Sequence, residues 1–480
     1  MKYQEKTVVS AIYDKVGSGG QVLNPFLEAM PELMDRGMFF EKIASLPPMP
    51  YDLAELSGEE RRRHLPVLQS VYYPMDYMYN IYDTLYRAVT TTYTTRTTME
   101  SIRQLNAVHE DFRGTRGNGP SFATQGESGS ILGVPGIGKT STIRRCLDLI
   151  PQVIVHTKYN GKPFYEKQIT HLVVECPSDC SVKTLAFNII EAVDRAMGSQ
   201  YYEASTRIRS TSASALATQV KIICLNHHIG LLVIDEIQNA VATAQRNKQV
   251  KPLVKFLVEL TNDTSTSIYF VGTPMAEELF ISQEHLKRRT RGLRLLPLKP
   301  GGLYRDFLKI IWAYQFTRKR AGLTDRLANL IYDYSGGIPA YICKIFQEAQ
   351  VQAILTGKEI IDEPVIMRAV RLLSIEIPKK YAKGSYISDF TDEAGYEPVD
   401  DVEEVKGPVE GMNGGIGAIA SSDGPEPLEE TVPRLYAKPR GRKKAQRDPM
   451  DLLELLKLAR SPEAMMSALD KYNMLEVVKC

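Results

Sequence analysis

The sequence lacks the features of a secreted or membrane-spanning protein. Its first residues hold no apolar core of signal-peptide length, and no run approaches the roughly 18 apolar residues of a spanning helix. Its six cysteines are scattered, and the pair Cys176 and Cys180 has no second pair or flanking histidine to complete a zinc set. We therefore expect a reduced chain in the cytoplasm, with no membrane partner.

The sequence also has little excess charge. Its 59 Lys and Arg against 57 Asp and Glu give a formal net charge of +2. This is too small for bulk attraction to nucleic acid, so any such site has to be a local basic patch. The 43% of hydrophobic and 24% of charged residues are typical of a globular protein, and the length allows about three domains.

Composition divides the chain into five parts. Residues 1–125 are rich in Tyr and Thr, residues 126–300 alternate short β-type runs with helical stretches, and residues 301–383 show the periodicity of a small helical domain. Residues 384–447 are rich in Gly, Pro, Asp and Glu, which predicts a disordered linker, and they end in a basic cluster. Residues 448–480 have helical spacing and are expected to form a tail that docks on a partner or folds on binding.

Two local patterns in the first part predict different structures. Ser57 and Glu60 have the spacing of a capping box, so a mostly helical segment is expected to begin there. The threonine-rich run at 90–98 favours an extended or loop state, because β-branched residues lose side-chain freedom in helices.

The second and third parts predict an α/β fold, with a mainly parallel sheet and helices on both faces, followed by a helical lid. The runs LLVID and SIYFVG are apolar without alternation, as expected for strands buried on both faces. The predicted strands are 128–132, 171–176, 231–235 and 267–272, and the helical candidates between them include 181–197 and 213–226. The helices predicted for the lid are 304–320, 324–334, 339–356 and 364–374.

The clearest chemical motif is a complete G-x-x-x-x-G-K-T loop between a predicted strand and a helical run. Glycines let the backbone turn its N–H groups toward phosphate oxygens, and the helix N-terminus adds a partial positive charge. Lys139 is expected to neutralise the β and γ phosphates of ATP, and Thr140 to supply a hydroxyl to Mg²⁺. The expected ATP-binding residues of the loop are Gly133, Val134, Pro135, Gly136, Ile137, Gly138, Lys139, Thr140 and Ser141.

An acidic pair, Asp235 and Glu236, follows the predicted strand LLVI. Carboxylates at the end of a buried strand are costly unless they serve a purpose. We expect Asp235 to hold Mg²⁺ and its waters, and Glu236 to polarise the attacking water. A helix N-cap at the exit of the strand is the alternative, and the phosphate-binding loop favours the catalytic interpretation.

Two further features are candidates for a part in hydrolysis. Thr273 ends the next predicted strand, where a polar side chain can sense the γ-phosphate, although it could equally be a turn residue. Arg288 and Arg289 lie in the basic run that follows. An arginine that reaches a neighbouring subunit's nucleotide can raise the rate by about 10³–10⁵-fold, and a solvated basic face is the alternative.

With these motifs the chain resembles the TnsC family, the AAA+ ATPase regulators of Tn-type cut-and-paste transposons (including CRISPR-associated transposons), which are related to TniB. The resemblance covers most of residues 20–375 and rests on GVPGIGKT, GLLVIDEIQNA and FVGTPMAEELF. NPFLEAMPE at 24–32, PQVIVHTKYNG after the loop's helix and SGGIP at 335–339 are further matches. The resemblance implies an AAA+ P-loop NTPase core with a small α-helical lid.

The resemblance also assigns further nucleotide contacts. Tyr93 and Arg96 match residues that the family carries near the adenine, although the stretch TTTYTTRTT departs from the family's Gly-Tyr and Arg-Asn-Pro pattern. Gly337 and Pro339, at the start of a lid helix, would complete the ATP site.

TnsC-like proteins oligomerise with ATP into rings, such as heptamers, or filaments around double-stranded DNA. They link a target-selection protein of the TnsD/TniQ kind to transposase and nuclease subunits, and hydrolysis resets the complex. A bacterial, cytoplasmic protein is implied. Five basic residues are candidates for contacts with DNA phosphates. They are Lys158, Lys162 and Lys167, on a loop after the P-loop helix, and Arg207 and Arg209, before another helix. Each of them could instead be an ordinary surface charge.

Two alternatives to a transposition regulator remain open. A DNA-dependent AAA+ loader outside transposition would have the same nucleotide site but would leave NPFLEAMPE without a role. A STAND-type signalling ATPase switch would hold ADP in a closed monomer, which a trans arginine such as Arg288 or Arg289 disfavours. The tail's basic cluster either helps to dock the transposase or contacts DNA.

Overall fold

The chain's structure is a computed structural model that divides by contacts into two units, Met1–Glu404 and Val405–Cys480. All described residues lie in the first unit. They are residues 8–13, 24–50, 53, 55–96, 104, 106–108, 110, 126–207, 212–240, 250–277, 292–377 and 396–398. The predicted tail at 448–480 lies outside them.

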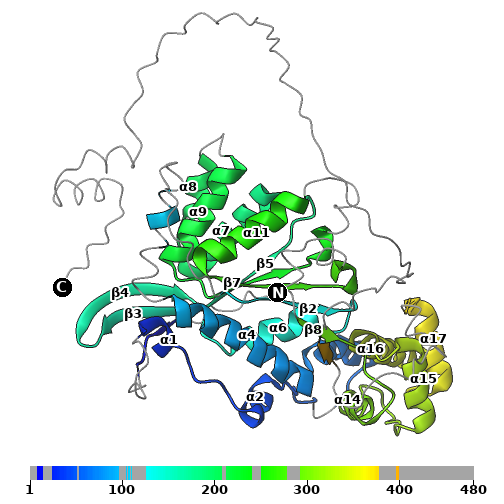
Figure 1. Cartoon of the computed structure of the whole chain (residues 1–480). Coiled ribbons are helices and arrows are strands. Elements are labelled where there is room, and N and C mark those ends of the chain that lie inside the picture. Colours follow the sequence, from blue (N-terminus) through cyan, green and yellow to red (C-terminus); the bar gives the residue numbers. More distant parts are fainter. Residues whose placement is uncertain are drawn as a thin grey trace, which may run out of the picture. The chain divides into compact units, whose positions relative to one another are not determined.

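A six-stranded sheet forms the centre of the described residues (Figure 1). Its strand order is β5-β6-β7-β2-β8-β9, and neighbouring strands are parallel except that β9 runs antiparallel to β8. The expected α/β fold with a mainly parallel sheet is confirmed. The strands are β2 (Ser128–Gly133), β5 (His171–Glu175), β6 (Leu231–Asp235), β7 (Ser267–Gly272), β8 (Gly292–Leu295) and β9 (Tyr396–Pro398).

Helices cover both faces of this sheet (Figure 1). One face carries α4 (Asp76–Thr95) and α6 (Lys139–Asp148). The helices on the other face are α7 (Val182–Met197), α9 (Ala213–Asn226) and α11 (Val250–Thr264), with the short α8 (Tyr201–Arg207) beside α7.

Successive residues of β6 enter two different hydrophobic clusters. Leu231 and Val233 are buried in the cluster on the α4 and α6 side. Leu232 and Ile234 are buried in the cluster formed with α7, α9 and α11. Both faces of the strand are therefore apolar, which is the physical reason for a run without alternation.

The segment before the sheet is largely helical, as the capping box predicts. Ser57 accepts the N–H of Glu60 at 3.3 Å, and Glu60 accepts the N–H of Ser57 at 2.8 Å, which completes the box at the start of α3. The elements of this segment are α1 (Pro25–Glu28), α2 (Arg36–Ile43), α3 (Gly58–His64) and the 3-10 helix η1 (Leu65–Ser70), which precede α4.

The expectation of an extended or loop state at 90–98 is wrong up to residue 95, where α4 ends. The Thr94 hydroxyl donates a hydrogen bond to the carbonyl of Thr90 at 2.9 Å, within the helix. Thr92 donates to the carbonyl of Gly230 at 2.7 Å, and Tyr93 is fully buried. Tertiary packing against the sheet thus overrides the weak local preference of β-branched residues.

A second, three-stranded sheet was not expected. Its order is β1-β3-β4, and β3 and β4 form an antiparallel arm with Asn160 and Gly161 at its turn (Figure 1). Both turn residues have positive φ, 47° and 78°, as an Asn-Gly hairpin requires. Its strands are β1 (Val8–Ser10), β3 (Val153–Tyr159) and β4 (Lys162–Ile169).

The lid helices are confirmed, with one difference in length. They are α14 (Gly302–Trp312), α15 (Asp325–Ser335), α16 (Pro339–Leu355) and α17 (Glu363–Leu373). The first ends earlier than the predicted residue 320 because Gln315 donates to the carbonyls of Trp312 and Ala321, at 3.0 and 2.9 Å, in place of the next helical turn.

The expectation of a linker without regular structure is wrong at Tyr396–Pro398, which form β9. Arg294 and Leu295 of β8 pair with Glu397 and Tyr396, so the linker supplies an edge strand to the main sheet. The free main-chain groups of an edge strand favour such pairing over sequence preference. No helix among the described residues has the length and apolar content needed to cross a membrane.

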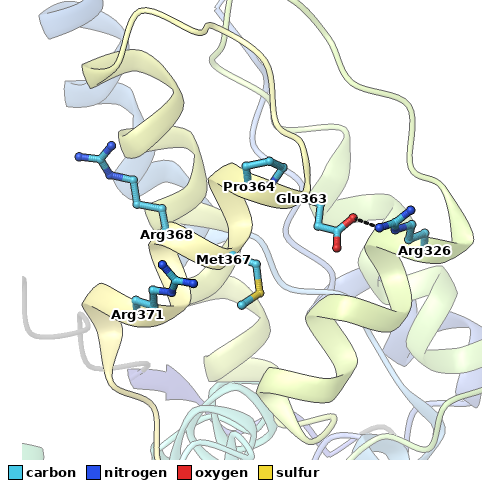
Figure 2. A pocket seen from close by; sticks show the side chains of 6 residues that line it. All are labelled: Arg326, Glu363, Pro364, Met367, Arg368 and Arg371. Atoms are coloured by element: carbon cyan, nitrogen blue, oxygen red, sulfur yellow. Dashed lines mark ion pairs between the residues drawn. The ribbon is translucent and has the colours of Figure 1, made fainter.

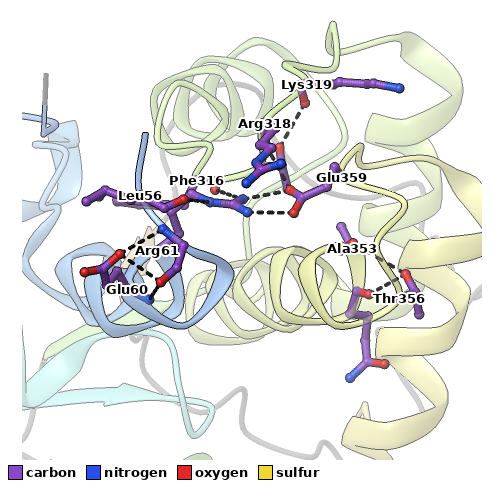
Figure 3. Close-up of polar contacts among 12 residues, drawn as sticks. Leu56, Glu60, Arg61, Phe316, Arg318, Lys319, Ala353, Thr356 and Glu359 are labelled. Carbon is purple, nitrogen blue, oxygen red and sulfur yellow. Dashed lines mark hydrogen bonds and ion pairs between the residues drawn. The ribbon is translucent and has the colours of Figure 1, made fainter. Parts of the chain in front are cut away.

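A buried arginine fastens the N-terminal segment to the lid (Figure 3). Arg61 of α3 is 1% exposed and forms a bidentate ion pair with Glu359 at 2.6 and 2.7 Å. It also donates to the carbonyl of Phe316 at 2.9 Å. Further along the same segment, the hydroxyls of Tyr72 and of Thr142 on α6 lie 2.7 Å apart. The N-terminal segment therefore contacts both the lid and the helix that follows the phosphate-binding loop.

Candidate nucleotide site

The glycine-rich loop lies between β2 and α6, in the context that its sequence predicts. Gly136 and Gly138 have φ values of +81° and +99°, which glycine adopts without strain. A Cβ on Gly133 would lie 3.0 Å from side-chain atoms of Ile137 and Leu295. The loop thus needs glycine both for its turns and for close packing, and Gly138 caps the N-terminus of α6.

Lys139 is the cation of this loop. Its Nζ donates to the carbonyls of Gly133 and Val134, at 2.8 and 3.2 Å. Burial lowers the pKa of Lys139, while the negative charges of Glu236 and Asp235 act in the opposite direction. Phosphate oxygens could replace these carbonyl partners, so the ammonium group is held where an anionic ligand would need it.

Thr140 and Asp235 bring the loop and β6 together. The Thr140 hydroxyl donates to Asp235 Oδ2 at 2.8 Å, and Oδ1 accepts the N–H of Glu236 at 2.9 Å. Asp235 is 4% exposed, at the carboxyl end of its strand. One carboxylate and one hydroxyl suit Mg²⁺, which usually keeps waters and substrate phosphates as its other ligands. The donor set therefore fits a magnesium–nucleotide complex.

Glu236 follows directly, in the left-handed region with φ +57°. A non-glycine residue in that conformation costs energy, and such residues cluster at functional sites. Its side chain is exposed, and Gln238 donates a hydrogen bond to its Oε2. The acidic pair therefore splits, with Asp235 turned toward Thr140 and Glu236 toward solvent.

Thr273 lies at the carboxyl end of β7, the strand next to β6. Its N–H donates to Oε1 of Gln238 at 3.1 Å. It precedes the short 3-10 helix η2 (Pro274–Ala276), and its side chain forms no capping hydrogen bond there. The Thr273 carbonyl accepts the N–H of Ala276 at 2.9 Å, so Thr273 is part of a turn, and its role as a sensor stays a prediction.

The lid touches the loop at the start of α16. The N–H of Ala340 donates to the carbonyl of Gly136 at 3.2 Å. Gly337, with φ +72°, accepts the N–H of Leu298 at 2.9 Å, and a Cβ on it would lie 2.0 Å from the Leu298 carbonyl oxygen. Gly337 and Pro339 are thereby held beside the phosphate-binding loop, on the lid side.

Two predicted nucleotide contacts lie in the interior instead. Tyr93 and Arg96 are fully buried. The Tyr93 hydroxyl donates to the carbonyls of Ile169 and His228, at 3.0 and 2.9 Å. Arg96 donates to the Ile229 carbonyl at 3.0 Å, and burial lowers its pKa to about 10. Both side chains therefore bond main-chain carbonyls at the end of β4 and just before β6.

The remaining candidates are spread over the surface or lie beyond the described residues. Lys158, Lys162 and Lys167 are on the β3–β4 arm, so their expected placement on a loop is wrong; the Asn-Gly turn signals the hairpin. Arg207 ends α8 and pairs with Glu203 at 2.5 Å. Arg209, Arg288 and Arg289 lie outside the described residues.

A hollow of about 670 Å³ on the lid is separate from this site (Figure 2). Arg326 and Glu363 form an ion pair at 2.5 Å on one side of it. Its lining residues are Arg326, Glu363, Pro364, Met367, Arg368 and Arg371. None of them belongs to the phosphate-binding loop or to the ends of β6 and β7.

Comparison with a protein-family model agrees with the geometry. Residues 123–280 match the model described as an AAA domain, and they include the loop, Asp235, Glu236 and Thr273. This part of the chain is an AAA-type P-loop domain, with a parallel sheet and helices on both faces. The chain matches none of the curated proteins with which it was compared.

Solved structures give weaker likenesses. The chain is 13% identical to Drosophila ORC bound to DNA, with a TM-score of 0.39 and 69% of each chain covered. The Aeropyrum pernix ORC1 protein in complex with DNA is 15% identical, with a TM-score of 0.36; 57% of this chain and 65% of that one are covered, just under two thirds. The Thermotoga maritima RuvB Holliday junction branch migration motor is 15% identical, with a TM-score of 0.29 and coverage of 58% and 70%.

Proposed function

We propose that the chain binds ATP with Mg²⁺, hydrolyses it and acts as a nucleotide-dependent switch. The observation that carries this proposal is the 2.8 Å contact between Thr140 and Asp235, because it joins the phosphate-binding loop to the strand end that bears Glu236. A loop alone would only hold the nucleotide. The carboxylate beside it adds a group that can take a proton from water.

Each residue of the site then has a part in hydrolysis. Lys139 binds the β and γ phosphates, and Thr140 and Asp235 hold Mg²⁺, which neutralises charge on the phosphates when it is bound. Glu236 orients the attacking water and accepts its proton. Thr273 senses the γ-phosphate, so the protein differs between its ATP and ADP states.

The TnsC resemblance extends this proposal to transposition. The ATP-bound chain would assemble into rings or filaments on double-stranded DNA and link a TnsD/TniQ-like target-selection protein to transposase and nuclease subunits. Arg288 or Arg289 would reach the nucleotide of the neighbouring subunit. Co-purification of a transposase with the chain in ATP but not in ADP tests this role, and its absence in both would favour the DNA-loader alternative.

The segment at 24–32, which resembles the TnsC family, supports the proposed role in transposition. Asn24 caps α1 by accepting the N–H groups of Phe26 and Leu27, at 3.1 and 3.4 Å. Phe26 is fully buried and stacks on His228 with ring centroids 4.0 Å apart, and its carbonyl accepts from Gln168 of β4 at 3.0 Å. This segment therefore packs against the base of the β3–β4 arm and can set its position.

The outer face of that arm is where we propose DNA contact. Side chains alternate between the two faces of a strand, and in the register of the arm Lys158 pairs with Pro163 and Lys167 with Val155. Tyr165, 78% exposed, lies between Pro163 and Lys167 on the same face. This face thus presents two exposed lysines around an exposed aromatic ring, a combination suited to a nucleic-acid backbone.

Lys162 belongs to the opposite face of the arm. It pairs with Tyr159, which donates to Glu28 at 2.8 Å and packs on Tyr13 at 5.0 Å between ring centroids. The geometry therefore separates the three lysines that the sequence groups together.

We expect the double variant Lys158→Ala, Lys167→Ala to bind duplex DNA more weakly at all sequences. Each lost phosphate contact removes about one unit from the slope of log affinity against log salt, so the slope should fall by about two. Fluorescence anisotropy with labelled duplex at several salt concentrations, in ATP, measures both quantities.

Lys162→Ala is the matched control for this experiment, and it should change the affinity and the slope less than either single variant of the outer face. An effect of Lys162→Ala equal to that of the double variant would contradict the assignment of the outer face.

A further inference from the structure

The Gln238 amide lies between two residues that the proposed reaction uses. Its Nε2 donates a hydrogen bond to Oε2 of Glu236. Its Oε1 accepts the N–H of Thr273 at 3.1 Å. A single planar group thus joins the carboxyl end of β6 to the carboxyl end of β7. Gln238 stands in the DEIQ run that supports the family resemblance, but its spacing alone does not indicate a role.

Hydrogen bonds of both neighbouring residues fix the main chain around Gln238. The N–H of Ile237 donates to the carbonyl of Val271 at 3.0 Å, which ties the turn to β7. Asn239 donates from its side chain to the carbonyl of Cys176 at 3.0 Å, at the exit of β5. A Cβ on Gly272 would lie 2.6 Å from Oε1 of Gln238. The space for the amide is therefore defined closely by its neighbours.

We propose that Gln238 is a positioning residue that couples Thr273 to Glu236, a proposal that rests on the proposed hydrolysis of ATP. The donor side of the amide fixes one oxygen of the Glu236 carboxylate and leaves the other for the attacking water. The acceptor side is fixed by the main chain of Thr273. A displacement at Thr273 when the γ-phosphate binds or leaves is passed to the carboxylate through the amide.

Glu236 needs such a partner for a physical reason. Its side chain is exposed and its backbone is in the left-handed region, so a free carboxylate would sample several rotamers. General-base catalysis requires the carboxylate within hydrogen-bond reach of the water, and a misplaced base loses rate without loss of binding. Gln238 touches neither the phosphate-binding loop nor Asp235 in the hydrogen bonds described, so its loss should spare nucleotide affinity.

The test compares Gln238→Ala with Gly272→Ala and Asn239→Ala in the full chain. Gln238→Ala removes the amide, and Gly272→Ala keeps it but forces its Oε1 to move. Asn239→Ala removes an amide from the same turn whose described hydrogen bond goes to the main-chain carbonyl of Cys176, just after β5. We expect the first two variants to lower kcat for ATP hydrolysis by about 10- to 100-fold and the third to lower it less than about threefold.

Affinity for a fluorescent ATP analogue is the second readout. We expect the Kd of all three variants to stay within about threefold of the wild type. Gln238→Asn, whose shorter amide cannot join both partners, provides a milder change and should also lower kcat, which keeps the test decisive if Gln238→Ala does not fold.

The outcomes separate two failures. If the wild-type chain binds the analogue but does not hydrolyse ATP, the proposed function is wrong. If the wild type hydrolyses ATP and the folded Gln238 variants have an unchanged or higher kcat, or lose rate only through a weaker Kd, the coupling role of Gln238 is overturned.

Discussion

Replacing Glu236 with glutamine is expected to slow ATP hydrolysis by about 10²–10⁴-fold, the typical contribution of a general base. ATP affinity should stay close to that of the wild type, because Lys139, Thr140 and Asp235 keep their contacts. Glutamine has the size of glutamate, and the side chain is exposed, so the fold should tolerate the change. Steady-state phosphate release and the Kd for a fluorescent ATP analogue measure the two quantities.

Glu191→Gln is the control for loss of a surface carboxylate. Glu191 is on α7, 52% exposed, with Arg195 at 3.8 Å as its ion-pair partner. It should leave hydrolysis unchanged. A loss of less than about threefold in Glu236→Gln would show that another group serves as the base.

Arg61→Met is expected to lower the free energy of unfolding by about 3 kcal/mol. The change removes the partner of a carboxylate whose side chain is only 15% exposed, and breaking a buried pair by removing one partner costs about 3–5 kcal/mol. The hydrogen bonds from Arg61 lower the pKa of Glu359 from its usual 4.5. This contribution is therefore present above that pH and is lost as the pH falls through the lowered pKa.

Denaturant unfolding at pH 7 and at pH 4 measures this effect, and Arg305→Ala is its control. Arg305 pairs with Asp325 at 2.5 Å, but the two side chains are 44% and 78% exposed. Exposed pairs contribute about 0–1 kcal/mol. Equal losses in the two variants would mean that the link between α3 and the lid adds little to stability.

The parts of the fold that the sequence predicts are those with short-range causes. LLVID is an unbroken apolar run within one segment, and the strand that this run predicts is found at Leu231–Asp235. The loop also has a local cause, because Gly138 adopts a positive φ and caps the helix that begins at Lys139. The Ser57 capping box is likewise a contact between neighbours in sequence.

The missed features depend on contacts between distant segments. The helix through Thr92 and Tyr93 is held by the main chain of Gly230, Ile169 and His228, which no local propensity encodes. The antiparallel β3–β4 arm breaks the expected alternation of strands and helices, and its Asn-Gly turn is the one local signal that could have revealed it.

The candidate site shows the same division. Lys139, Thr140, Asp235 and Glu236 have motif spacing, and the loop and the strand end meet in the structure. No sequence pattern marks Gln238 as functional, because its proposed role depends on the side-by-side position of β6 and β7. Sequence spacing alone does not give that position.

Sedimentation of the purified chain with duplex DNA tests whether the chain assembles on DNA in an ATP-dependent manner. The samples contain a non-hydrolysable ATP analogue or ADP, with Lys139→Ala as the variant that cannot neutralise the phosphates. We predict large nucleoprotein assemblies with the ATP analogue, and none with ADP or with the variant. A chain that sediments as a monomer and does not bind DNA with either nucleotide would contradict the proposed ATP-dependent assembly on DNA. That result would favour a STAND-type signalling ATPase.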